Sequence, residues 1–185
     1  YWGLNTWLPT LLKQAGYSMY ASIGYVFIMN LAWIPSGILG SYLADKIGRK
    51  TPIAVYLILA GITSLFYGWA LAEKLPVEIM LGCGTLAVVF MAGAYSIVYA
   101  YTPENYPTEV RGTGTGLANS WGRIGGMLAP TTVGFLYPLI GLYLTLSIVA
   151  IGFVLAGLAV ALLGIETRGK NLEAISDDSA HSMDA

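Results

Sequence analysis

Charged residues are scarce in this chain of 185 residues, where they make up 10% of the sequence against 56% hydrophobic residues. An average soluble domain has roughly 25% charged residues, and these help to cover its surface. A soluble fold of this composition would leave too much apolar surface in contact with water. The scarcity of charge therefore excludes an ordinary soluble domain and favours a protein embedded in a membrane.

Cysteine, histidine and net charge are also nearly absent, and each absence excludes a class of function. Cys83 is the only cysteine, so it forms no disulfide within the chain. His181 is the only histidine and lies in a polar tail, so we expect no metal site and no cofactor. A formal net charge of −1 offers no basic face for nucleic acid. No constellation of His, Cys and acidic residues indicates an enzyme.

Long segments without any charge divide the chain. Such segments lie between Lys13 and Asp45, between Lys50 and Glu73, and between Glu78 and Glu104. A fourth segment runs from residue 123 to residue 166 and is interrupted by a turn-like sequence at 137–141. Each is long enough for the ~20 residues that cross a bilayer as a helix, and the fourth is long enough for more. The sequence therefore predicts an all-α membrane protein.

We predict five full membrane spans after a shorter first helix. The spans are expected at residues 19–43, 51–72, 77–101, 112–136 and 141–164. Residues 1–13 would form a helix only about 20 Å long at 1.5 Å per residue, whereas the hydrocarbon core is ~30 Å thick. We therefore expect the chain to begin inside a span, so that residues 1–164 form the helical bundle and residues 165–185 a polar tail.

The basic residues give these spans an orientation. If the spans alternate in direction, six basic residues fall on one side of the membrane, and only Lys13 and Lys74 fall on the other. The six are Lys46, Arg49, Lys50, Arg111, Arg168 and Lys170. By the positive-inside rule that side is cytoplasmic. We therefore expect a multi-pass protein of the cell membrane with the loops 44–50 and 102–111 and the tail in the cytoplasm.

The most specific signal is the segment 41–50, SYLADKIGRK. It resembles the signature G-x-L-A-D-R/K-x-G-R/K-R/K, which major facilitator transporters carry in the cytoplasmic loop between the second and third helices of each half. Ser41 stands where the first glycine is usual, with Gly40 one residue earlier. Asp45 precedes an arginine by four residues, and Gly48 permits a sharp turn. A basic stop at the end of a membrane helix is the alternative, but it needs neither Asp45 nor Gly48.

Two further elements follow at the distances that this family would have. Residues 104–111, ENYPTEVR, resemble the E-x6-R element of sugar-porter-like halves. Residues 166–173, ETRGKNLE, resemble the P-E-T-K-G-x-x-L-E element after the last helix, with Ile165 where proline is usual. Each alone is compatible with a solvated charge cluster. In this order and spacing, the three elements resemble the carboxy-terminal half of a major facilitator transporter over about residues 1–176.

This resemblance implies both an architecture and an activity. The architecture is a six-helix carboxy-terminal bundle, with its first helix truncated here and an amino-terminal six-helix half missing from the chain. The activity is secondary active transport by alternating access, in which a small polar organic solute such as an organic anion, an aromatic acid or a sugar binds between the halves near the bilayer midplane. The resemblance also implies proton coupling, through a carboxylate expected in the missing half. A transport-inactive membrane receptor or scaffold with the same fold is the alternative.

The resemblance further implies a conformational latch, meaning a cytoplasmic charge network that holds the outward-open state and breaks as the two halves move. The residues expected to form it are Asp45, Arg49, Glu104, Arg111 and Glu166.

Candidates for binding the solute are polar and aromatic residues inside the predicted spans. They are Asn5, Asn30, Trp33, Tyr95, Tyr99, Asn119 and Arg123. The aromatic residues could instead pack or form an interfacial belt, and Asn30 could bond another helix. Arg123 lies on a stripe of small residues at helical spacing, and an arginine this deep in a span usually faces a cavity or a partner. It could hold an anionic group of the solute, or pair with a carboxylate of the missing half.

Cysteine labelling of the complete protein in a Cys83→Ser background tests the orientation. We expect a cysteine placed at Ile47 to react only with reagents that reach the cytoplasm, and one placed at Leu75, beside Lys74, to react from outside, because the basic loops stay inside. The reverse pattern of labelling would contradict the orientation and the cytoplasmic latch together.

Overall fold

The computed structural model describes residues 6–7, 9–10, 12–13 and 16–167, and this part of the chain forms helices and turns without a β-strand. The predicted all-α fold is confirmed. Four helical stretches are long and apolar enough to cross a membrane: Met19–Ile47, Lys50–Ala72, Val77–Glu104 and Arg111–Leu163. The solute-binding candidate Asn5 and the tail from residue 168 onward lie outside the described residues.

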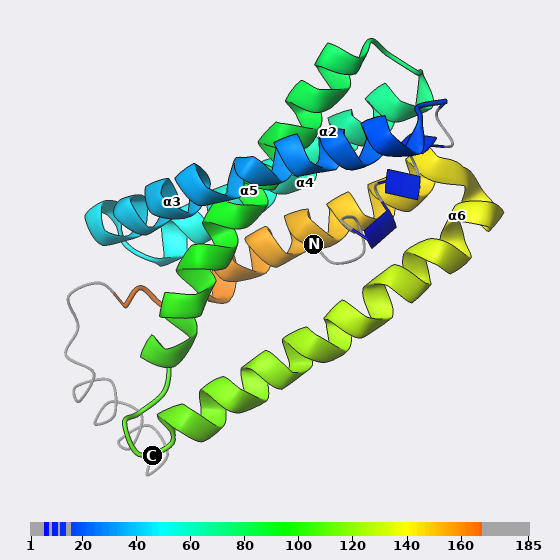
Figure 1. The fold of residues 1–185 in the computed structure, drawn as a ribbon. Helices are drawn as coiled ribbons and strands as arrows, with labels where there is room; N and C mark the ends of the chain where they lie inside the picture. The colour runs from blue at the N-terminus through cyan, green and yellow to red at the C-terminus, as the bar shows by residue number, and fades with distance from the viewer. Residues whose placement is uncertain (1–5, 8, 11, 14–15, 168–185) are drawn as a thin grey trace.

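Within these stretches the structure has five helices (Figure 1). They are α2 (Met19–Leu31), α3 (Trp33–Ile47), α4 (Lys50–Ala72), α5 (Val77–Glu104) and α6 (Arg111–Leu163).

The stretch 19–47 is interrupted at Ala32, so the single span expected there consists of α2 and α3. The N–H of Ala32 bonds the carbonyl of Met29 at 3.3 Å, a tighter turn than that of an α-helix. Pro35 accounts for the break, because its ring has no N–H to give to the carbonyl of Leu31 and crowds it.

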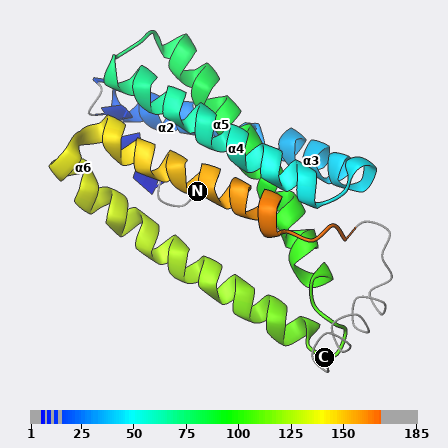
Figure 2. The ribbon, with the colours of Figure 1, turned by 180° about the vertical axis from the view of Figure 1, so that it is seen from behind.

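The helix α6 is bent at Gly141, where φ is 80° and ψ is 173°. Only glycine adopts such a φ readily, and Pro138 just before it already removes a helical hydrogen bond. The turn expected at 137–141 is thus confirmed. We call residues 111–140 the proximal arm and residues 142–163 the distal arm. The distal arm lies beside α4, while the proximal arm runs along the outside of the bundle (Figures 1 and 2).

Buried side chains join α4, α5 and the distal arm into one body. A larger cluster includes Met29, Tyr67, Met80 and Leu146. A smaller one near the turn between α3 and α4 contains Ala44, Ile53, Tyr56, Ala94 and Ile97. In α6 every buried residue except Val133 belongs to the distal arm. The proximal arm therefore packs little against the rest of the described chain, and most of its surface is uncovered.

Glycines set how closely these helices approach one another. A Cβ at Gly40 of α3 would lie 2.8 Å from the carbonyl oxygen of Gly93 in α5. A Cβ at Gly61 of α4 would lie 2.8 Å from the carbonyl oxygen of Ala150 in the distal arm. Lipid is as apolar as a leucine side chain, so close packing of small residues is a main source of helix association in membranes. Gly40 thus makes a close contact with α5, whereas Ser41, which stands where the signature usually has glycine, is exposed.

Replacing Gly40 tests this contact. We expect Gly40→Ala to lower the free energy of unfolding by about 1–3 kcal/mol, because the new methyl group meets a backbone atom that has no room to move. Gly82→Ala is the matched control, since a Cβ there has no neighbour within 4 Å. Thermal unfolding of the complete protein in detergent measures both changes. Equal melting temperatures for the two variants would contradict the close contact.

Candidate functional site

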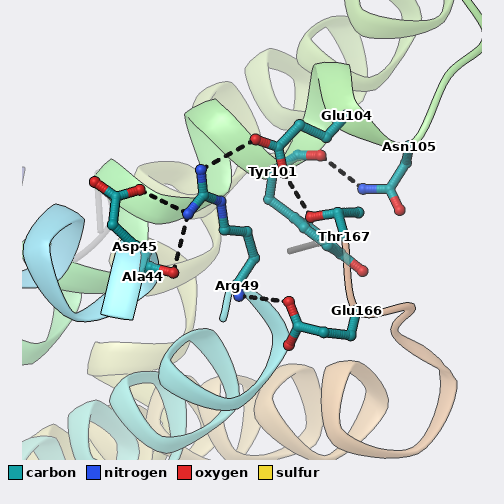
Figure 3. Close-up of polar contacts among 8 residues, drawn as sticks. All are labelled: Ala44, Asp45, Arg49, Tyr101, Glu104, Asn105, Glu166 and Thr167. Atoms are coloured by element: carbon teal, nitrogen blue, oxygen red, sulfur yellow. Dashed lines mark hydrogen bonds and ion pairs between the residues drawn. The ribbon is translucent and has the colours of Figure 1, made fainter. Parts of the chain in front are cut away.

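Arg49, in the turn between α3 and α4, is the centre of a polar cluster (Figure 3). Its Nη1 donates to Oδ1 of Asp45 at 2.7 Å and to the carbonyl oxygen of Ala44 at 2.9 Å. Its Nη2 donates to Oε1 of Glu104, the last residue of α5, at 3.3 Å. One guanidinium therefore joins the end of α3 to the end of α5.

The two ion pairs of Arg49 differ in their exposure to solvent. The Arg49 side chain is 19% exposed, that of Glu104 is 26% exposed and that of Asp45 is 74% exposed. The pair with Asp45 is open to screening and contributes roughly 0–1 kcal/mol, whereas the pair with Glu104 is better protected. Burial by itself would lower the pKa of Arg49, but the hydrogen bonds and charges of Asp45 and Glu104 outweigh it and raise that pKa above its ordinary value. The guanidinium therefore stays charged at any physiological pH.

The carboxylate of Glu166 caps the amino-terminal end of α4. Its Oε1 accepts from the backbone N–H of Arg49 at 2.8 Å, and its Oε2 accepts from the backbone N–H of Lys50 at 3.3 Å. The first N–H groups of a helix have no partner within the helix, and the positive end of the helix dipole favours a negative charge there. Glu166 thus provides the missing hydrogen-bond acceptors at the start of α4, although it lies 117 positions after Arg49 in the sequence.

Gly48 makes room for the cap. Its φ of 117° lies in the region that favours glycine, and a Cβ would lie 2.5 Å from Oε2 of Glu166. The sharp turn expected at Gly48 is confirmed, and the reason for glycine is double: the backbone conformation and the neighbouring carboxylate.

The segment Ile165–Thr167, which we call the strap, binds the ends of both α4 and α5. The hydroxyl of Tyr101 donates to the carbonyl of Ile165 at 2.8 Å and accepts from its N–H at 2.9 Å. The hydroxyl of Thr167 donates to Oε2 of Glu104 at 2.5 Å. The sequence analysis did not single out Tyr101 or Thr167. Thr167 lies inside the recognised element 166–173, whereas nothing in the sequence distinguishes Tyr101 from the other tyrosines.

Four of the five residues expected in the latch lie together in this cluster, namely Asp45, Arg49, Glu104 and Glu166 (Figure 3). Arg111 lies at the start of α6, where its Nε donates to the carbonyl of Tyr106 at 3.4 Å and its Nη2 to the hydroxyl of Thr108 at 3.2 Å. Glu166 joins the cluster through backbone N–H groups, those of Arg49 and Lys50.

Three of the solute-binding candidates are brought together across α3 and α5. The hydroxyls of Tyr95 and Tyr99 are 2.8 Å apart, and their rings meet edge to face with centroids separated by 4.7 Å. The ring of Trp33 meets that of Tyr95 in the same manner at 5.8 Å. Both tyrosines are exposed, and Trp33 is partly exposed. Asn30 donates from its amide to the carbonyl of Val26 within its own helix at 2.8 Å.

Arg123 and Asn119 are exposed on the proximal arm of α6. They lie on the stripe of residues at helical spacing that continues to Pro130. The indole N–H of Trp7 donates to the carbonyl of Pro130 at 2.7 Å, and a Cβ at Gly134 would lie 2.5 Å from the Trp7 ring. Trp7 therefore lies against the far end of the arm that carries Arg123.

Comparison with known proteins assigns the family. The family model described as the Major Facilitator Superfamily matches residues 1–130. The chain belongs to the major facilitator superfamily. The resemblance stated from the sequence motifs is thus confirmed. The chain is part of an integral membrane protein, and its family is one of transporters and not of enzymes.

Individual relatives match most of this chain, but the match covers only part of each relative's own length. The niacin transporter NiaP of Acinetobacter baylyi (strain ATCC 33305 / BD413 / ADP1) is 37% identical over 181 residues, which cover 95% of this chain and 39% of that protein. The benzoate transport protein of the same strain is 33% identical over 138 residues, or 75% of this chain and 29% of that protein. A crystal structure of a double tryptophan mutant of XylE has a TM-score of 0.79 at 21% identity, covering 94% of this chain and 38% of that one. This likeness shows the fold, and the chain spans about two fifths of the niacin transporter's length.

Replacing Gly48 tests the cap on α4, with Gly16 as the matched position. Gly16 also has a positive φ, of 104°, but a Cβ there has no neighbour within 4 Å. Alanine at either position costs about 1–2 kcal/mol of backbone strain. We expect Gly48→Ala to cost about 0.5–2 kcal/mol more in thermal unfolding, because it also displaces the capping carboxylate.

A second background makes that comparison decisive. In a Glu166→Ala protein there is no carboxylate to displace, so the extra cost of Gly48→Ala should disappear. An extra cost that persists in this background would show that Glu166 is not its cause.

Proposed function

We propose that this chain supplies the second six-helix bundle of a secondary transporter, which moves a small organic anion by alternating access with proton coupling. The remaining half of the transporter lies in parts of the protein outside this chain. The observation that carries the proposal is the Arg49 cluster, a charged contact among three helix ends of a largely apolar bundle. The transporter relatives support it.

The Arg49 cluster has the strength that a reversible latch needs. The pair with Asp45 is solvent-exposed, and the pair with Glu104 rests on one contact of 3.3 Å. Pairs of this kind contribute on the order of 1 kcal/mol each. Two conformations must differ by only a few kcal/mol if a transporter is to pass between them, so these contacts are strong enough to bias the equilibrium without freezing it. We place the cluster, with the tail, on the cytoplasmic side.

The anion specificity rests on Arg123. It lies twelve residues into α6, about 18 Å from the helix start at 1.5 Å per residue. Inserting a charged side chain at such depth in a membrane costs about 2.5–3.5 kcal/mol of free energy on insertion scales. Such a side chain therefore faces a water-filled cavity or a partner. Within the described helices the carboxylates of Asp45, Glu78 and Glu104 lie near helix ends. We therefore assign the carboxylate of a solute as the partner of Arg123.

The aromatic cluster of Trp33, Tyr95 and Tyr99 suits the rest of such a solute. Rings pack favourably edge to face against aromatic side chains, and the exposed hydroxyls of the two tyrosines offer hydrogen bonds. Niacin and benzoate, after which two of the relatives are named, are both planar aromatic carboxylates. Asn30 and Asn119 are further polar groups for this site. The described spans have no acidic residue near their middle, so the proton-carrying carboxylate is assigned to the rest of the protein.

Binding of a carboxylate and its neutral amide tests the role of Arg123. With the complete protein in detergent, we expect benzoate to bind more tightly than benzamide. Arg123→Lys should weaken benzoate binding about tenfold and Arg123→Ala more, because lysine retains the charge but loses the planar fork that holds a carboxylate through two hydrogen bonds. Isothermal titration calorimetry measures both affinities.

Trp121→Ala is the control, since it removes a large exposed side chain from the other face of the same arm and should leave binding unchanged. Equal binding of benzoate and benzamide, or unchanged benzoate affinity in Arg123→Ala, would favour a structural ion pair for Arg123. Benzoate uptake into proteoliposomes then separates a transporter from a receptor of the same fold, which would bind benzoate without moving it.

A further inference from the structure

The two oxygens of the Glu104 carboxylate have different partners (Figure 3). Oε1 accepts from Nη2 of Arg49 at 3.3 Å, while Oε2 accepts from the hydroxyl of Thr167 at 2.5 Å. Hydrogen bonds between a guanidinium and a carboxylate are usually about 2.7–2.9 Å long, and those from a hydroxyl to a carboxylate about 2.5–2.7 Å. The contact with Thr167 is thus at its full strength, and the contact with Arg49 is stretched.

The guanidinium of Arg49 has a donor left over on the side that faces Glu104. Among the described residues, Nε of Arg49 is buried and has no hydrogen-bond partner. Nη1 is already occupied by Asp45 and the carbonyl of Ala44. The N–H of Nε is parallel to an N–H of Nη2, and together they form the fork to which a carboxylate binds through both oxygens. Glu104 occupies one prong of this fork, and the other prong is unused.

We propose that Thr167 is a positioning residue that keeps the Arg49–Glu104 pair to a single hydrogen bond, by holding Oε2 of Glu104 away from Nε of Arg49. The proposal rests on the proposed function, in which this pair is part of the conformational latch. Thr167 thereby sets the strength of the latch without contacting the solute.

The structure holds Thr167 firmly enough for this task. The residue is only 7% exposed. Two residues earlier, both backbone groups of Ile165 bond the hydroxyl of Tyr101, and the intervening Glu166 caps α4. The hydroxyl is therefore fixed relative to α5, the helix that carries Glu104, and relative to the turn that carries Arg49.

A single hydrogen bond between Arg49 and Glu104 allows the latch to open. A carboxylate bound through both oxygens to the fork of a largely buried arginine would favour the latched state strongly, whereas a single stretched bond leaves the two states close in free energy. Removing the Thr167 hydroxyl should let Glu104 turn both oxygens onto Arg49. The latch should then tighten and opening should slow.

Transport kinetics of the complete protein in proteoliposomes test this inference, with radiolabelled benzoate as the probe. We expect Thr167→Val, which removes the hydroxyl at nearly constant volume, to slow benzoate exchange at saturating concentration by about three- to tenfold, the factor for one additional charge-assisted hydrogen bond at a partly exposed site. Benzoate affinity should change less than about twofold, because the solute site is not touched. Thr167→Ala should act in the same direction, and Thr167→Ser, which keeps the donor, should behave as wild type.

The Arg49→Lys background tells whether the effect passes through the fork. Lysine has no second prong, so Thr167→Val should cause no further slowing there. Slowing that persists in Arg49→Lys, faster exchange in Thr167→Val, or equal rates for Thr167→Val and Thr167→Ser would each overturn the inference. If Arg49→Lys and Glu104→Gln themselves leave exchange unchanged, the latch of the proposed function is wrong instead.

A spectroscopic readout keeps the inference testable if a variant does not transport. Protein labelled with 15N-arginine gives an Nε–H signal for Arg49, identified by its loss in Arg49→Lys. We expect this proton to exchange with water more slowly in Thr167→Val and Thr167→Ala than in wild type or Thr167→Ser, because it gains an acceptor. Equal exchange rates in all four proteins would overturn the inference.

Discussion

The contact between the carboxylate of Glu166 and the first backbone N–H groups of α4 joins the end of the last helix to the start of an earlier one. The rest of the polar cluster depends on this contact. It sets the path of the strap, and so brings the Thr167 hydroxyl to Glu104. It also requires glycine at position 48, which in turn lets Arg49 fold back toward Asp45. The first N–H groups of α4 would otherwise have no partner within the helix. The carboxylate that bonds them also holds the strap after α6 beside the ends of α4 and α5.

The bundle divides into a body and an arm, and this division suits a transporter. Close glycine contacts bind α3 to α5 and α4 to the distal arm of α6, and the Arg49 cluster lies at the ends of these helices. The proximal arm, which carries Arg123, contributes little to the core. In the proposed mechanism the body transmits the state of the latch, and the arm presents a charge to the solute. Separate packing allows these two tasks to be tuned independently, since residues without shared contacts affect free energies nearly additively.

Features set by neighbours along the chain could be predicted from the sequence. The uncharged segments predicted apolar helices, because backbone groups in lipid must be bonded within the helix. The four-residue spacing of Asp45 and Arg49 predicted their contact, and so did that of Tyr95 and Tyr99. The break at Ala32 was not anticipated, although Pro35 is its local cause, because proline is frequent within membrane helices.

The sequence by itself determined the all-α class, the family, the bend at Gly141 and the charged residues that mark one end of the bundle. Only the tertiary structure decided how those charges are paired. Glu104 is 55 positions from Arg49 and 63 from Thr167, and no periodicity relates residues so far apart. The same holds for the contacts of Glu166 with the N–H groups of Arg49 and Lys50, because any residue provides such a group and no motif reveals it. Arg111, from a recognised element, instead bonds its own turn, since the nearest acceptors of an arginine at a helix start are those of the loop before it.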